Sequence, residues 1–313
     1  MSSVGRNILA FLLCLGLSSC VHKELCYDHS HICEVDVVFD WTGVSQEDIP
    51  ATMSLYLFPR DGGRLRRFEF ADFRGGRVRL EGGYYDAVCV NSGVREVEVL
   101  YSEGFYDFAI RSKSAYRLAG LSDVSTKAIP RAKGTEEERV TSAPEIVWTA
   151  VETEADLRTT GSALLMKPLK KARRIFVEIR NAENLRWING VSATLSTMSG
   201  GYLPSQDRLS EENVTIMFNC AYSIDEEKIL GSLTTFGHCS EESSKHLLTL
   251  YVILADNSKW FYIFDVTDQV HESGEGDIRI ILDKLPIPQP ATEGGGLKPE
   301  VMEWKEITFD IKM

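Results

Sequence analysis

The chain has 313 residues, of which 43% are hydrophobic and 26% charged, so it can form ordinary packed cores and does not have the composition of a disordered protein. Acidic residues outnumber basic ones by 46 to 34, which gives a formal net charge of −12. Such a surface repels nucleic acid and anionic membrane surfaces, so a nucleic-acid-binding protein is excluded. The length exceeds that of one typical core and suggests two domains.

The amino terminus is arranged like a bacterial secretion signal. Arg6 precedes an apolar run at residues 8–17, which is too short to span a membrane because a spanning helix needs about 20 residues. The run ends in Leu17-Ser18-Ser19-Cys20, which resembles the lipobox of bacterial lipoproteins: an aliphatic residue, two small residues and a cysteine that receives diacylglycerol. We therefore expect residues 1–19 to be removed and Cys20 to be lipidated. The alternative is an ordinary signal peptide with an incidental cysteine.

Cysteine use beyond Cys20 leaves the disulfide pattern open. Five cysteines remain in the mature chain, an odd number in a compartment that permits disulfides. We consider two local pairs, Cys26 with Cys33 and Cys220 with Cys239, which leave Cys89 buried and reduced. On the chain-entropy argument, closing the second loop would stabilise the fold by about 3 kcal/mol.

Alternation of apolar and polar residues predicts β-strands through the first hundred residues. Apolar side chains occupy every second position from Val35 to Trp41, so this strand should bury one face. Glycine pairs at 62–63, 75–76 and 82–83 supply positive φ for tight turns between further strands. We expect those strands at residues 53–58, 67–70, 77–80 and 84–90. The pattern is that of an antiparallel meander or Greek key.

The signal weakens after Leu121, and the polar residues 122–143 are expected to form an exposed loop. A short strand with Ile146, Trp148 and Ala150 on one face should return to the first domain before the polar stretch 152–160. Strand patterns resume at residues 174–179, 191–195, 214–218, 247–254, 260–266, 278–282 and 307–311, with one or two helical turns within 265–272.

Strands of this length and spacing, joined by short turns that contain Gly and Pro, favour an all-β fold of two tandem β-sandwiches. We expect a signal peptide at 1–19, a lipidated tether at 20–34, an N-terminal sandwich at 35–155 and a C-terminal sandwich at 156–313. No fixed-period repeat is visible, which argues against a solenoid or propeller.

A candidate metal site lies close to the lipid anchor. His29, His31 and Cys33 would share one face of a strand and could hold zinc. Their spacing does not match the usual paired-ligand zinc signature, and the run falls where a tether is expected. A structural segment or a local disulfide with Cys26 is therefore favoured, and no metal is expected.

Catalytic motifs are missing from the sequence. There is no Gly-x-Ser-x-Gly, His-Glu-x-x-His or Gly-x-x-x-x-Gly-Lys pattern, so we expect no enzyme activity, cofactor or small-molecule substrate. Asp36 and Asp40 fall on the solvent face of a strand, where a structural role is favoured over acid–base chemistry. A group of arginines brackets a Gly-Gly turn, most simply in a soluble hairpin and alternatively at a docking site for an acidic partner: Arg60, Arg64, Arg66 and Arg67.

Aromatic side chains offer a second kind of candidate site, because sugars stack on exposed rings. Trp187, beside the Asn189-Gly190 turn, is the best candidate for exposure. Trp41 and Trp260 instead lie in strand-like alternations that indicate core burial. Asn213-Val214-Thr215 matches a glycosylation acceptor, but in a bacterial lipoprotein we interpret it as a strand entrance.

Several segments carry a family resemblance. Beyond Cys20, the first hundred residues contain ELCYDHSH (24–31), VVFDW (37–41), MSLYLFP (53–59), the Gly62-Gly63 turn with RFEF (67–70) and GYYDAVCVN (83–91), and looser matches are TMSGG (197–201) and IRIIL (278–282). In these segments the sequence resembles the fimbrillin-associated anchor lipoproteins of Bacteroidales, the FimB type of fimbrium component. It is most similar to a subgroup known only as a domain of unknown function.

The resemblance implies two transthyretin-like β-sandwiches and a lipidated Cys20 that holds the protein in the outer membrane. It also implies that the protein is a surface-exposed anchor or accessory subunit of a fimbrium. Its partners would be fimbrillin-like β-sandwich subunits bound by strand addition. The alternating residues 307–313 either complete the protein's own sheet or are donated to a partner. The alternative function is a surface glycan-binding lipoprotein that works beside nutrient importers, and the third and least favoured hypothesis is an enzyme of unrecognised type.

Overall fold

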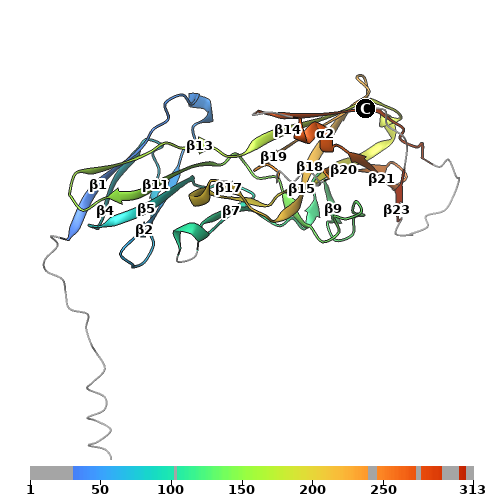
Figure 1. Ribbon diagram of the computed structural model, residues 1–313. Helices are drawn as coiled ribbons and strands as arrows, with labels where there is room; N and C mark the ends of the chain where they lie inside the picture. The colour runs from blue at the N-terminus through green and yellow to red at the C-terminus, as the bar shows by residue number, and fades with distance from the viewer. Residues whose placement is uncertain (1–30, 102–103, 239–244, 273–275, 291–302, 308–313) are drawn as a thin grey trace, which may run out of the picture.

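The computed structural model describes residues 31–101, 104–238, 245–272, 276–290 and 303–307, which form an elongated molecule of sandwich-like sheets (Figure 1). The all-β fold class predicted from the alternation is confirmed. Helical residues in the described part are confined to α2 (Thr267–His271) and four 3-10 turns, η1 (Gln46–Asp48), η2 (Phe105–Asp107), η3 (Leu185–Trp187) and η4 (Pro204–Gln206). Within these described ranges, no helix has the length and apolar character that crossing a membrane requires.

Two sheets enclose the N-terminal core, with the strand orders β12-β1-β4 and β13-β11-β5-β2-β3. Strand β12 runs parallel to β1, whereas β4 pairs with β1 antiparallel. The strands are β1 (Ile32–Phe39), β2 (Met53–Pro59), β3 (Arg66–Phe70), β4 (Gly75–Glu81), β5 (Tyr84–Asn91), β11 (Trp148–Asp156), β12 (Ser162–Met166) and β13 (Leu169–Lys170).

The N-terminal core follows the predicted alternation of β1. Val35, Val37 and Phe39 point inward and are almost fully buried, and each such side chain contributes roughly 1.5–3 kcal/mol. Just beyond the strand, the ring of Trp41 meets that of Trp148 edge-on, with centroids 5.5 Å apart, and Trp41 Nε1 donates to the carbonyl of Phe73 at 2.7 Å. The indole is therefore buried with its polar group satisfied.

A single nine-stranded sheet encloses the C-terminal core, with the order β22-β14-β19-β18-β15-β20-β21-β23 and with β10 paired to β18 off this path. Strand β18 joins two parts of the sheet: residues 213–219 pair with β15 and residues 220–223 pair with β19. The two parts contribute to one apolar core. The strands are β14 (Arg173–Ala182), β15 (Ile188–Ser199), β18 (Asn213–Ser223), β19 (Lys228–Thr235), β20 (Leu247–Leu254), β21 (Lys259–Asp265), β22 (Ile278–Leu285) and β23 (Trp304–Glu306).

A glycine is required where β18 passes from one part of the sheet to the other. Gly231 of β19 pairs with Cys220, and a Cβ on Gly231 would lie only 2.6 Å from Cε2 of Phe218. Any larger residue at this position would push the buried Phe218 ring aside.

The end of the chain partly matches its prediction. Helix α2 forms within the expected residues 265–272, and β23 pairs in parallel with β21. Of the predicted strand at 307–311, only Ile307 lies within the described residues, where its N–H donates to the carbonyl of Phe261 at 3.1 Å.

A third layer covers the outer face of the β2–β5 sheet. Tyr56 and Phe58 of β2 point away from the N-terminal core and pack against Phe108 and Ile110 of this layer. As a result β2 is buried on both faces from Met53 to Phe58, and its sequence shows no clean alternation. The layer has the order β17-β16-β7-β6, built from β6 (Val97–Leu100), β7 (Ala109–Ser112), β16 (Gly201–Leu203) and β17 (Arg208–Leu209).

The prediction of an exposed loop at residues 122–143 is wrong. This stretch contains most of β9 (Leu121–Ser125), which pairs with β8 (Arg117–Leu118), and all of β10 (Arg139–Ser142), which pairs in parallel with β18. Val124 and Ile129 are buried against Tyr251 and Phe261 on the outer face of the C-terminal sheet. The apolar residues of this stretch are few and irregularly spaced, so the sequence shows no strand pattern. They nevertheless cover apolar side chains of the C-terminal sheet.

Charged side chains fasten β10 to the C-terminal sheet. Arg139 donates from Nε and Nη2 to the two carboxylate oxygens of Glu212 at 2.9 and 3.0 Å, and Arg111 Nη2 adds a bond of 3.1 Å. Beside this pair, Glu138 accepts a bond of 2.6 Å from the hydroxyl of Thr215. The hydrogen bonds from Arg139 lower the pKa of Glu212 below its ordinary value.

Strand pairing interleaves segments from both sides of the predicted boundary at residue 155. Strands β12 and β13 follow that boundary but belong to the N-terminal sheets, and β16 and β17 extend the layer over β2 and β5. In the opposite direction, β10 precedes the boundary but joins the C-terminal sheet. The division into residues 35–155 and 156–313 stays a prediction.

Replacing Glu212 tests how strongly β10 is held. In Glu212→Gln the guanidinium groups of Arg139 and Arg111 lose their charged acceptor, so we expect the free energy of unfolding to fall by about 1–3 kcal/mol in urea titrations at neutral pH. The neighbouring Glu211, whose side chain is 89% exposed, is the matched control, and Glu211→Gln should stay within about 0.5 kcal/mol of the wild type.

The pH dependence of this difference has a defined sign. Because the folded-state pKa of Glu212 is depressed, its contribution is fully present above the unfolded-state pKa of about 4.3 and is lost as the pH falls through the folded-state value. The two unfolding curves should therefore converge in acid; a constant gap between wild type and Glu212→Gln across this range would contradict the assignment.

Candidate functional site

Several predicted site residues lie outside the described part of the chain: Cys20, Cys26, His29 and Cys239. Of the candidate zinc run, His31 is exposed in a turn, while Cys33 is buried and its thiol donates to the carbonyl of Arg158 at 3.0 Å. The two described members thus differ in environment, which fits the structural interpretation of this segment.

The described cysteines are buried to different degrees. Cys89 is fully buried, as predicted, and burial raises the pKa of its thiol to about 12. Cys220 lies half-buried in β18, and burial likewise raises its pKa to about 12. Because Cys239 is not described, the pairing of Cys220 with Cys239 stays a prediction.

The arginine cluster and the aspartates on β1 have structural partners. Arg60 Nη1 contacts Glu154 at 2.6 Å, Arg66 contacts Glu81 at 3.5 Å, and Arg67 pairs with Glu69. Asp36 accepts a bond of 2.8 Å from Arg77, and the same bond lowers its pKa. These pairs support the interpretation of a soluble hairpin and a solvated strand face.

Trp187, the tryptophan expected to be exposed, and Trp260, the one expected in the core, each have a cation near the ring. The guanidinium of Arg186 lies 5.3 Å from the ring centre of Trp187, and Lys305 Nζ lies 5.2 Å from that of Trp260. Trp260 Nε1 also donates to Ser258 Oγ at 3.1 Å. Both side chains are half-buried, so Trp187 is less exposed and Trp260 less buried than predicted. The arrangement gives the glycan hypothesis no specific support.

An open edge runs along one side of the N-terminal sheets. Within the described residues, β12 pairs only with β1, and β11 beyond Thr149 pairs only with β5. Leu165 of β12 is 59% exposed and stands opposite the exposed Val38 of β1. Leu169 of β13 is exposed as well. Apolar side chains beside unpaired strand edges are unusual on a solvated surface.

A groove of about 440 Å³ lies between these two edges, which we call the edge groove. It is lined by Thr149, Ala150, Val151 and Glu152 of β11, by Leu165 and Leu169, and by Lys167, Lys171, Tyr202 and Asp207 among others. Burial raises the pKa of Tyr202 to about 12, so its neutral phenol donates to Asp207. Lys171 Nζ contacts the same carboxylate at 2.8 Å. The groove combines two backbone edges with two exposed leucines, which suits an extended peptide better than a small ligand.

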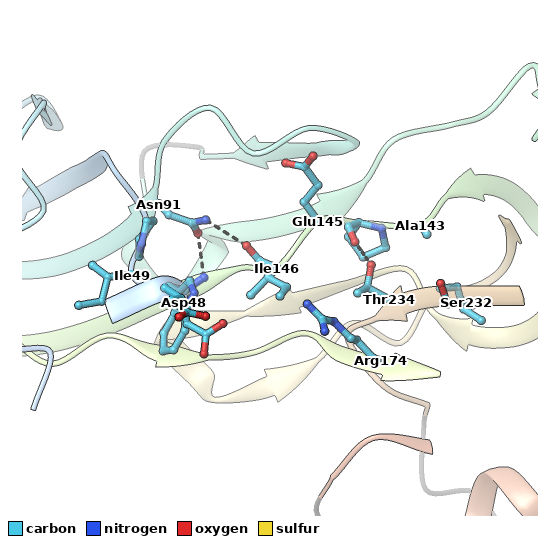
Figure 2. Close-up of a pocket in the computed structure, with 14 residues that line it drawn as sticks. Asp48, Ile49, Asn91, Ala143, Glu145, Ile146, Arg174, Ser232 and Thr234 are labelled. Carbon is cyan, nitrogen blue, oxygen red and sulfur yellow. Dashed lines mark hydrogen bonds between the residues drawn. The ribbon is translucent and has the colours of Figure 1, made fainter. Parts of the chain in front are cut away.

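A second groove, of about 650 Å³, lies where the N-terminal and C-terminal sheets meet. Figure 2 shows how the connector at residues 143–147 is held there: Asn91 Nδ2 donates to the carbonyl of Ile146 at 3.0 Å, and its Oδ1 accepts the N–H of Trp148 at 2.8 Å. From β19, the hydroxyl of Thr234 donates to the carbonyl of Pro144. These contacts bind the connector to both sets of sheets, so we assign this groove a structural role.

Sequence reasoning did not find the edge groove. Leu165 and Leu169 fall in a short stretch that has too few residues for an alternation signal, and β11 was predicted only for its inward face. The sole signal in the sequence is a group of three leucines among lysines, SALLMKPLKK at 162–171, after the polar stretch 152–160.

Residues 19–219 match the family described as Domain of unknown function (DUF5119). This chain belongs to the DUF5119 family. The match covers more than half of the chain, including every strand of the N-terminal sheets, and it confirms the resemblance to a subgroup of unknown function. No curated protein matches this DUF5119 chain significantly.

Solved structures resemble this DUF5119 protein, and one of them, with a TM-score above 0.5, shares its fold. A protein from Bacteroides ovatus, described as an adhesin, is 18% identical over 88% of this chain and 99% of its own, with a TM-score of 0.62. The fimbrial anchor protein Mfa2 from Porphyromonas gingivalis is 12% identical over 80% of this chain and 90% of its own, with a TM-score of 0.48. A Bacteroides thetaiotaomicron protein described as polysaccharide-binding is 12% identical over 80% and 89%, with a TM-score of 0.47.

The junction contacts of Asn91 predict a measurable stability loss. Asn91→Ala leaves the carbonyl of Ile146 and the N–H of Trp148 without these partners, so the free energy of unfolding should fall by about 1–3 kcal/mol. Asn189 is exposed, and Asn189→Ala should change it by no more than about 0.5 kcal/mol. Equal urea midpoints for Asn91→Ala and the wild type would refute the structural role of this amide.

Proposed function

We propose that this protein is a non-enzymatic lipoprotein, held in the outer membrane through lipid on Cys20, that serves as an anchor or accessory subunit of a fimbrium-like surface assembly. It binds its partner, a fimbrillin-like β-sandwich subunit, by strand addition. The observation that carries the proposal is the edge groove, where two sheet edges and two exposed leucines lie side by side.

The chemistry of strand addition matches this groove. An incoming extended segment finds backbone donors and acceptors on β11 or β12, and its alternate side chains can cover Leu165 and Leu169. Burying one leucine contributes roughly 1.5–3 kcal/mol, which corresponds to about ten- to a hundredfold in affinity. Charged side chains of both signs line the same groove, namely Lys167 and Lys171 with Asp40, Glu152 and Asp207, so the polar side chains of an inserted strand can find a partner there whatever their charge.

Two further observations support the proposal. The lipobox-like Leu17-Ser18-Ser19-Cys20 supplies a membrane attachment at the amino terminus, close in sequence to β1. The Bacteroides ovatus protein of the same fold is described as an adhesin, which is a cell-surface role.

Membrane attachment is tested by Cys20→Ala. Without the thiol no diacylglycerol is added, so the folded protein should leave the membrane fraction and appear in the soluble extracytoplasmic fraction. Fractionation followed by immunoblotting measures the change, and Cys89→Ala, which alters a buried thiol, is the control that should stay with the membrane. A Cys20→Ala protein that still sediments with membranes would disprove lipid anchoring through this residue.

Partner binding is tested by placing a charge in the edge groove. In the native bacterium, Leu165→Lys should stay in the membrane but release the surface polymer into the medium, with affinity reduced at least about tenfold. Ile224→Lys is the matched control, because Ile224 is 55% exposed on another part of the surface and its replacement should leave the polymer on the cell. Cells that retain the polymer equally with either variant would show that the edge groove does not hold it.

A further inference from the structure

Three of the six histidines of the chain meet at one end of the C-terminal core, although no two of them are close in sequence. His238 follows β19, His246 immediately precedes β20, and His271 is the last residue of α2. Their ring centres lie 4.8–5.0 Å apart, and the nearest ring nitrogens of the three all lie within 4.8 Å of one another. Nothing in the proposed function uses this cluster, which we call the histidine triplet.

The hydrogen bonds of His246, the buried member of the triplet, determine which of its ring nitrogens carries the proton. His246 Nδ1 lies 3.3 Å from the backbone carbonyl of Ser196, which can only accept, so Nδ1 carries the proton. The lone pair is therefore on Nε2, which faces Nε2 of His271 at 3.1 Å. Burial lowers the pKa of His246 to about 4, so the ring is neutral in ordinary conditions, the form that binds metals.

The backbone around His246 is also held from two sides. Its N–H donates to Thr267 Oγ1 at 2.9 Å, and its carbonyl accepts the N–H of Val266 at 2.9 Å. The N–H of Leu247 donates to Ser196 Oγ at 3.1 Å. A ring whose far nitrogen is bonded to a carbonyl and whose backbone is fixed has the support that metal-binding histidines have in proteins.

We propose that His238, His246 and His271 form a site for one divalent transition-metal ion of the zinc class, bound by their imidazole nitrogens. Three imidazoles leave a fourth position of a tetrahedral ion open for water. With zinc–nitrogen bonds of about 2.0–2.1 Å, ligand nitrogens lie about 3.3 Å apart, close to the present His246–His271 separation. His238 and His271 are half-buried, so an ion can reach the site from solvent and the third nitrogen can move inward.

The bound ion would join three connections of the C-terminal sheet. His238 leaves β19, His246 enters β20, and α2 carries the chain from β21 to β22. Strands β19 and β22 lie in one part of the folded sheet, whereas β20 and β21 lie in the other. The ion would therefore fasten the two parts together at this end of the core, which should raise the thermal stability of the whole sheet.

The experiment uses the full lipidated chain in detergent, without a histidine tag, stripped of metal with a chelator and then titrated with zinc chloride. Calorimetry should show one equivalent bound, and zinc should raise the thermal midpoint of unfolding. His271→Ala should weaken binding at least about tenfold and abolish the zinc-dependent rise. His238→Ala should do the same, which keeps the test valid if one variant folds poorly; circular dichroism of the metal-free proteins checks their folding.

His31→Ala is the matched control, since His31 is exposed and belongs to the N-terminal run 26–33. It should bind zinc like the wild type. The proposal is overturned if the wild type binds no zinc, if folded His238→Ala and His271→Ala bind it with unchanged affinity, or if binding is lost only in His31→Ala. The last result would assign the ion to the N-terminal run, and a wild type without zinc affinity would mean that the triplet is a hydrogen-bonded stack in which His271 donates to His246.

Discussion

The ion pair between Arg139 and Glu212 fixes the position of β10, and the rest of the structure depends on that position. It holds β10 beside β18, so that a segment preceding the predicted boundary becomes part of the C-terminal sheet. With β10 in place, β9 and the residues after it cover Tyr251 and Phe261, whose rings would otherwise face water. The connector that follows then leads straight to β11 and the edge groove. A partly buried ion pair of this kind contributes little net stability, because both charged groups lose water when they meet. Its main effect is to select the position of β10 in the fold.

Much of the fold follows from local sequence, and the exceptions have a physical cause. Strand β1 could be predicted because only one of its faces is buried, which produces the alternation from Val35 to Trp41. Residues 122–143 could not, since they have no periodic pattern and are buried by contacts with strands a hundred residues away. The edge groove and the histidine triplet were missed for the same reason. His246 and His271 are 25 residues apart and meet only because α2 folds back beside the start of β20.

The two proposed sites lie on different sets of sheets and differ in character. The edge groove is apolar and open, and it belongs to the N-terminal sheets that the DUF5119 match covers completely. The histidine triplet lies beyond residue 219, outside that match, and its central ring is fully buried. The surface for a protein partner and the internal site for an ion are formed by different residues. Substitutions can therefore alter one site and leave the other intact.

The position of β1 has a mechanical consequence. In the proposed anchor, tension from the membrane reaches β1 at its start. The strand is paired with β4 from Ile32 to Val38 on one side and with β12 from Val35 to Phe39 on the other. A pull along the strand strains all of those hydrogen bonds together, in shear, rather than opening them one after another. A partner strand added to β12 would extend the same ladder, so the force would pass from lipid to polymer through parallel neighbouring strands. The lifetime of the attachment between polymer and membrane under mechanical force would then be set by the unfolding rate of this one sheet.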